Sequence, residues 1–143
     1  MKQDKDARQL RELVYRFMAE ERDQLAELKL RPHSRIVEMM YRYGPMTQST
    51  LGRLLNFEKS WISRMVDQLV ETGWVERTPN PQDRRSNILV LTEAGEVHAR
   101  QIGAMFDAHA RQVLDRLQDD GQSDVLRAMV HLTRVLPSPF GNA

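Results

Sequence analysis

Residues 47–92 read TQSTLGRLLNFEKSWISRMVDQLVETGWVERTPNPQDRRSNILVLT, and this stretch decides the fold. Its first half holds two segments, residues 47–56 and 58–72, in which apolar side chains recur at helical spacing. Those apolar positions are Leu51, Leu54, Leu55, Ile62, Met65, Val66 and Leu69. Thr47 is a favoured N-cap for the first segment and Asn56 for the second. Two short helices joined by a tight turn predict a helix-turn-helix.

The second half of the stretch predicts a β-hairpin. Residues 74–78 and 87–91 have the composition and alternation of strands, and the segment between them is rich in turn residues. Arg84 and Arg85 therefore lie at the hairpin tip, beside Asp83. We expect Asp83 to pair with an arginine of the hairpin or of the preceding helix, because phosphate would otherwise repel it. A hairpin directly after a helix-turn-helix is expected to form a wing.

Further helices are predicted on both sides of residues 47–92, because apolar side chains again recur at helical spacing there. The segments are residues 5–28 and 32–43 before the stretch and residues 93–118 and 123–136 after it, with a turn at residues 119–122. Thr92 is placed to cap the first of the two later helices. The sequence therefore predicts a mainly α chain of the α+β class: a winged helix-turn-helix between N-terminal and C-terminal helices.

Composition limits the class of protein. The chain has 143 residues, a length typical of one domain, with 29% charged residues, a net charge of +1 and no cysteine. The lack of cysteine excludes disulfides and thiolate metal sites. No apolar run reaches the length of a transmembrane helix, and the charged N-terminus has no signal-peptide core. We therefore expect a cytoplasmic protein that has no membrane partner.

The helix-turn-helix and the hairpin tip indicate contact with double-stranded DNA. The second helix of such a motif lies in the major groove, where its N-terminal residues reach base edges, and tip arginines suit a narrow minor groove. The candidate DNA-binding residues are Gln48, Ser49, Lys59, Ser60, Trp61, Ser63, Arg64, Gln68, Asp83, Arg84 and Arg85. Trp61 fits a place in the core as well as it fits DNA contact. Surface arginines alone are most often solvated charge, so the prediction rests on the combination of features.

Residues 46–96 resemble the winged-helix core of the multiple antibiotic resistance regulator (MarR) family. The matching features are the polar-Ser-x-hydrophobic-Ser-Arg run at Lys59–Arg64, Leu69 with Gly73, Val75-Glu76-Arg77, Asp83 with Arg85, and Leu91-Thr92-x-x-Gly95. Trp61 departs from the small polar residue that the resemblance leads one to expect. The features together are specific, although each alone is weak.

The resemblance implies a homodimer that binds a pseudo-palindromic operator. Residues 1–143 would form a single MarR-like domain, with dimerisation helices in residues 5–30 and 93–137 and a DNA-binding core in residues 31–92. Arg85 would enter the minor groove and Arg84 would contact phosphate. The function expected from the resemblance is a sequence-specific transcriptional regulator, a repressor released by a small molecule.

Many members of the family release DNA when a small phenolic or other anionic compound binds between the dimer helices and the winged helix. The candidate pocket residues here are Tyr15, Met18, Arg22, His33, Met40 and Tyr41. For the methionines and Tyr41 a plain core role is the favoured interpretation. No histidine forms an i, i+4 pair with another histidine, so no metal site and no cofactor are expected.

Three other classes of function deserve comparison with this one. No nucleophile–base pair, phosphate loop or paired-carboxylate motif stands out, so we expect the chain not to be an enzyme. A winged helix that binds another protein is one alternative. It stays open because residues 47–91 contain six Lys or Arg against five acids, a smaller positive excess than a DNA-binding segment usually carries. The regulatory half of an acetyltransferase fusion is the other, because similar winged-helix segments occur in such fusions.

Overall fold

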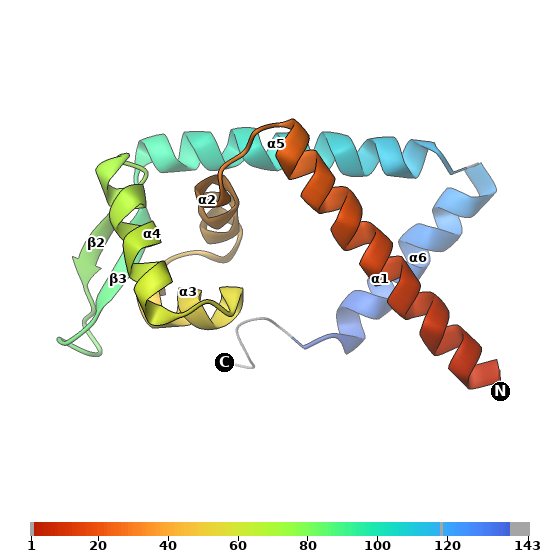
Figure 1. Ribbon diagram of the computed structural model, residues 1–143, viewed down its shortest axis with the longest axis horizontal. Coiled ribbons are helices and arrows are strands. Elements are labelled where there is room, and N and C mark those ends of the chain that lie inside the picture. The colour runs from red at the N-terminus through yellow and green to blue at the C-terminus, as the bar shows by residue number, and fades with distance from the viewer. Residues whose placement is uncertain (1, 118, 138–143) are drawn as a thin grey trace.

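The computed structural model describes residues 2–117 and 119–137. Six helices and three strands lie within these residues (Figure 1). In chain order they are α1 (Lys2–Glu27), α2 (Pro32–Tyr43), β1 (Met46–Thr47), α3 (Gln48–Leu55), α4 (Lys59–Glu71), β2 (Val75–Pro79), β3 (Asn87–Leu91), α5 (Glu93–Asp115) and α6 (Asp119–Val135). The expected winged helix-turn-helix between terminal helices is confirmed.

The core lies where α2, α3, α4 and α5 meet one small sheet. Its most deeply buried large side chains are Val37, Met40, Leu51, Ile62, Val66, Leu69, Val75 and Leu89. The sheet is antiparallel with strand order β1-β3-β2. Strand β1 was not predicted, because two residues are too few to show alternation; Met46 pairs with Leu89 and is buried. The helices therefore pack against a three-stranded sheet.

The helix caps agree with the sequence in two places and differ in one. Thr47 and Thr92 accept hydrogen bonds from the backbone N–H groups of Thr50 and Gly95, as predicted for N-caps. The prediction for Asn56 was wrong: Asn56 ends α3 in the left-handed conformation, with φ 52° and ψ 43°. Asparagine adopts this conformation more readily than most residues, so the turn forms without an N-cap side chain for α4.

The connection from α4 to the wing depends on Gly73. The N–H of Trp74 bonds to the carbonyl of Leu69, and the N–H of Gly73 bonds to the carbonyl of Val70. This Schellman pattern requires a left-handed residue at the glycine, and Gly73 has φ 79°. The chain thus reverses within one residue and enters β2 directly after α4.

Helix α5 packs against the same connection between α4 and β2. Gly95 lies so close to Trp74 that an added Cβ would stand 2.0 Å from the Trp74 carbonyl oxygen. His98, one turn later, stacks on the Trp74 ring with centroids 3.9 Å apart, and its Nε2 lies 3.1 Å from Ser34 Oγ of α2. Burial lowers the pKa of His98 below its ordinary value.

The terminal helices α1 and α6 extend away from the winged helix and pack sparsely on the rest of the chain (Figure 1). Their exposed large apolar side chains are Leu10, Leu13, Val14, Tyr15, Phe17 and Met18 on α1 and Leu126, Met129, Val130, Leu132 and Val135 on α6. The turn predicted at residues 119–122 was wrong, because α6 already begins at Asp119. In the part of the chain that is described, no helix has the length and apolarity needed to cross a membrane.

Candidate nucleic-acid interface

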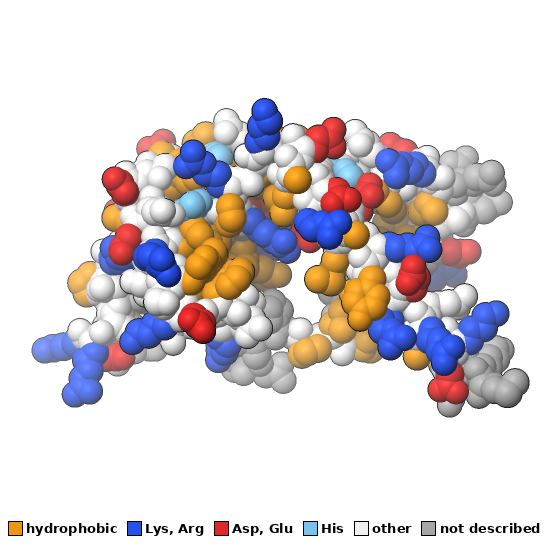
Figure 2. All heavy atoms as spheres, viewed as in Figure 1, with side chains coloured by type: hydrophobic (Ala, Val, Ile, Leu, Met, Phe, Trp, Pro, Cys, Tyr) orange, Lys and Arg blue, Asp and Glu red, His pale blue; other side chains and the backbone are white. Residues whose placement is uncertain are grey.

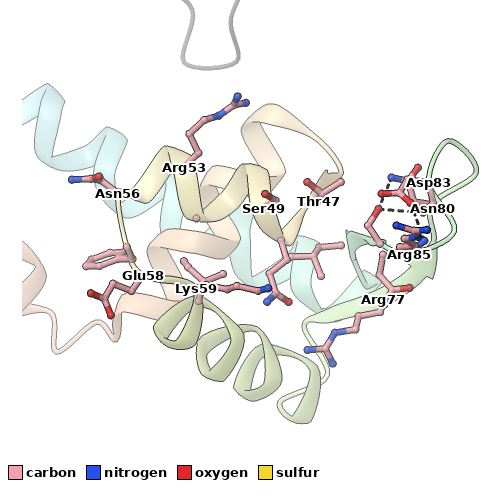
Figure 3. A pocket seen from close by; sticks show the side chains of 17 residues that line it. Thr47, Ser49, Arg53, Asn56, Glu58, Lys59, Arg77, Asn80, Asp83 and Arg85 are labelled. Carbon is pink, nitrogen blue, oxygen red and sulfur yellow. Dashed lines mark hydrogen bonds between the residues drawn. The ribbon is translucent and has the colours of Figure 1, made fainter.

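An open groove of about 900 Å³ connects α3, the beginning of α4 and the wing (Figure 3). Ser49 of α3, Lys59 of α4 and Arg85 of the wing all line it. The helix-turn-helix places the first two, and the hairpin between β2 and β3 brings the third alongside. Residues from three separate parts of the fold thus share one surface.

Positive charge predominates in this groove. Its cationic lining residues are Arg53, Lys59, Arg77 and Arg85, and its acidic ones are Glu58 and Asp83. Over residues 47–91 as a whole, bases and acids almost balance. The difference arises because the remaining acids of that segment, Asp67, Glu71 and Glu76, do not line the groove. Figure 2 shows a further concentration of basic side chains at the tip of the hairpin.

The wing tip is held by a hydrogen-bonded turn centred on Asp83. The carboxylate Oδ1 of Asp83 accepts from the Arg85 N–H at 2.9 Å, and the Asp83 carbonyl accepts from the Ser86 N–H at 3.0 Å. Asn80 closes the loop by donating from Nδ2 to Ser86 Oγ at 2.9 Å. Asp83 therefore holds an arginine of the wing, as expected, but through the backbone N–H of Arg85 and not through an ion pair with a guanidinium. Asp83 instead shapes the backbone that carries Arg85.

The predicted DNA-binding residues divide into two groups. Gln48, Ser49, Lys59, Asp83 and Arg85 line the groove, and Ser60, Trp61, Ser63, Arg64, Gln68 and Arg84 do not. Of the second group, Ser60, Arg64, Gln68 and Arg84 are exposed. The Gln68 Oε1 lies within hydrogen-bond distance of His33 Nε2 on α2, so a residue predicted for DNA touches one predicted for the effector.

Sequence reasoning missed three basic or aromatic residues of the groove. Arg53 follows Ser49 by one helical turn on α3, a spacing that could have been read from the sequence. Arg77 lines the groove from β2 and forms an ion pair with Asp67 of α4, which depends on how the sheet meets the helix. Phe57 lines the groove from the turn between α3 and α4.

The predicted effector residues do not surround one cavity of the described chain. Met40 is buried in the core, whereas Tyr15, Met18 and Tyr41 are exposed. A second cavity, of about 420 Å³, lies between α1, α2 and α5, and none of the six predicted residues lines it. Its charged lining residues are Glu20, Glu21, Arg35, Glu38, Arg42 and Asp107, and His109 also lines it. The ligand-pocket residues therefore stay a prediction.

Ion pairs already occupy both arginines of this second cavity. Arg42 lies 2.7 Å from Glu38, a hydrogen bond that raises the arginine pKa, and Arg35 lies 3.3 Å from Glu21. His109 Nε2 is buried without a hydrogen-bond partner, 3.7 Å from a Glu20 oxygen. Within residues 2–117 and 119–137, no three His, Asp or Glu side chains converge as metal ligands would.

Fold and groove together define a winged helix-turn-helix protein. A sequence profile of the MarR family matches residues 31–87, which include the helix-turn-helix and most of the wing. The chain is 30% identical over 92 residues to an uncharacterized HTH-type transcriptional regulator, YwoH of Bacillus subtilis, covering 64% of each chain. It is 34% identical over 71 residues to the multiple antibiotic resistance protein MarR of Escherichia coli, covering 50% of this chain and 49% of that protein. The resemblance to the MarR family is thus confirmed over residues 31–87.

The solved structures extend the likeness beyond the winged helix. The crystal structure of a mutant of E. coli MarR in complex with operator DNA is 26% identical with a TM-score of 0.61, and the match covers 89% of this chain and 92% of that one. The sequence matches to the two curated relatives, by contrast, span about half to just under two thirds of those proteins. The structural match thus spans more of the chain than these two sequence matches do.

Proposed function

We propose that this protein is a dimeric, sequence-specific DNA-binding transcriptional regulator. The observation that carries the proposal is the single groove that joins the start of α4 to the wing, with four basic lining residues against two acidic ones. A helix in the major groove and an arginine at a hairpin tip are complementary ways of reading B-DNA. The E. coli relative that shares the fold is known in complex with operator DNA.

The dimer is proposed from the terminal helices. Residues 5–30 and 93–137 carry exposed apolar rows that the described monomer leaves uncovered, above all on α1 and α6. Contiguous exposed apolar surface of this kind marks an interaction site. A second copy placed there would set two α4 helices side by side, and a two-fold symmetric pair fits a pseudo-palindromic operator. Residues 31–92 then form the DNA-binding core of each subunit.

Repression and release by a small molecule form the finer part of the proposal. The cavity between α1, α2 and α5 joins a dimerisation helix to the winged helix, so a ligand there could favour one spacing of the two α4 helices. A phenolic or other anionic effector would have to compete with Glu21 and Glu38 for Arg35 and Arg42. An aromatic effector would also meet Phe17, Tyr43 and Phe106 there.

Fluorescence anisotropy tests the proposal. A labelled duplex from the DNA upstream of the protein's own gene is compared with a scrambled duplex of equal composition, at several salt concentrations. We expect a preference for the native duplex, with the logarithm of affinity falling by about 0.9 per phosphate contacted for each unit of log salt. Equal binding to both duplexes, or none, would favour the alternative of a winged helix that binds protein.

A panel of phenolic acids added to the preformed complex tests the effector. Release of DNA at concentrations that also raise the melting temperature of the free protein supports the proposal, because both effects follow from one binding event. Release without a change in melting temperature would indicate competition at the DNA and contradict it.

A further inference from the structure

Phe57 is the single large hydrophobic side chain that stands exposed between residues 44 and 92, all of which the structure describes. It is 49% exposed and lines the groove together with Lys59, Arg53 and Arg85. The phosphate groups of DNA offer an apolar ring neither a hydrogen bond nor an ion pair. Exposed apolar surface within an otherwise polar patch instead indicates a specific contact.

The ring of Phe57 is held in place from two sides. It stacks on the Trp61 ring with centroids 4.1 Å apart and planes 28° apart, and Trp61 in turn packs against the core. The Phe57 N–H bonds to the Gly52 carbonyl at 3.2 Å, which fixes the backbone of the turn after α3. Trp61 therefore behaves as a support between the core and an exposed neighbour.

A purely structural role would also explain the contact between Phe57 and Trp61. An apolar residue just before a helix often packs on one in its first turn and fixes the direction of the chain. That role accounts for the stack, but it does not require a residue that lines the groove to stay 49% exposed. The start of α4 is also where a helix-turn-helix reaches base edges.

We propose that Phe57 reads a thymine methyl group in the major groove and that Trp61 is its positioning residue. The C5-methyl is the apolar feature of the major-groove edge, and phenylalanine is suited to contact it. The inference rests on the proposed DNA binding and adds a specificity determinant to it. Lys59 and Ser49 line the same groove (Figure 3) and would supply polar contacts to neighbouring bases.

The test replaces thymines of the operator one at a time with deoxyuridine, which removes the methyl and leaves base pairing unchanged. We expect one thymine in each half-site at which the wild-type protein binds about four-fold more weakly after replacement, the effect of one methylene-sized apolar group. The variant Phe57→Ala should lose this methyl effect at that thymine, while effects at other positions remain. Melting temperatures of both proteins establish that they are equally folded.

Trp61 is tested by a conservative pair of variants. Trp61→Ala should abolish the same methyl effect, and Trp61→Phe, which keeps a ring for Phe57 to stack on, should restore it. If the wild-type protein prefers the native duplex but shows no methyl effect, or if Phe57→Ala keeps the effect, the inference is overturned and the proposed function stands. If no duplex is preferred at all, both fail together.

Discussion

The winged-helix core buries its apolar side chains, whereas the terminal helices leave theirs exposed. Leu69 of α4 is 0% exposed, whereas Leu13 of α1 is 58% exposed. Both belong to apolar rows at helical spacing, so the sequence pattern is the same in the two regions. The difference is that the core meets a sheet and three other helices of its own chain, while the row on α1 meets little of the described chain. An amphipathic pattern shows that a face is to be buried, but not by which molecule.

The largest effect is expected where α5 packs against the start of the wing. Gly95→Ala would place a Cβ 2.0 Å from the Trp74 carbonyl oxygen, which is backbone and cannot move aside cheaply. We expect loss of cooperative unfolding or a fall in the free energy of unfolding of about 3 kcal/mol or more, measured by urea denaturation. Gly103→Ala on the same helix is the control: its Cβ would meet only Glu38, with Cγ at 3.9 Å. Equal stability of the two variants would contradict this account of the junction.

Two leucine-to-alanine variants separate the core from the terminal helices. Leu69→Ala should reduce the free energy of unfolding by about 2–5 kcal/mol, because a buried leucine leaves a cavity. The loss should be similar at two protein concentrations about 100-fold apart, since it lies within one chain. Leu13→Ala should instead weaken the dimer and so destabilise the protein chiefly at the lower concentration. If Leu13→Ala leaves the dimer dissociation constant unchanged, the exposed row on α1 is not the interface.

A smaller effect is expected at the wing, where Asp83 holds Arg85 through its backbone. Its carboxylate accepts from the Arg85 N–H rather than from a guanidinium. Asp83→Ala should therefore weaken operator binding by about 5- to 10-fold, corresponding to one lost hydrogen bond of about 1 kcal/mol, with little change in melting temperature. Asp83→Asn keeps an oxygen acceptor and should bind nearly as well as the wild type. If Asp83→Asn is as weak as Asp83→Ala, the charge matters and the turn does not explain it.

The smallest effect concerns His98, which lies between α2, α5 and the start of the wing. Because burial lowers its pKa below 6.5, the unfolded chain takes up a proton that the folded chain refuses. Stability should therefore be unaffected by this group well above pH 6.5 and should fall as the pH drops below that value. Urea midpoints at about pH 8 and about pH 5 measure this fall. His98→Phe, which keeps a ring on Trp74, should reduce it; His131→Phe, on exposed α6, should not.

Much of the fold could be predicted because local signals were strong. Pro32–Tyr43 and Asn87–Leu91 form their elements with the predicted bounds, and Thr47 and Thr92 cap as expected. The wrong predictions concern features that depend on contacts between residues distant in the sequence. Strand β1 exists because β3 offers a pairing edge. Asn56 ends one helix instead of starting the next because the chain there must turn sharply, and the two roles favour the same side chain.

The candidate site was less predictable than the fold. The sequence placed Lys59 and Arg85 near each other through the logic of a winged helix, and both line the groove. Arg77 could not be found in this way, because its position depends on the register of β2 and its pairing with Asp67. Phe57 was overlooked because an apolar residue next to an apolar stripe is read as core until its exposure is known.

The central claim is that the groove between α4 and the wing binds DNA, and one comparison of charge-matched variants tests it most directly. Arg85→Ala removes a cation from the groove, and Arg111→Ala removes one from the exposed surface of α5, so net charge changes equally. In anisotropy titrations of the native duplex, we expect Arg85→Ala to bind about 10- to 100-fold more weakly and Arg111→Ala to bind like the wild type. Similar affinities for the two variants would contradict the claim, because DNA would then respond to total charge and not to this groove.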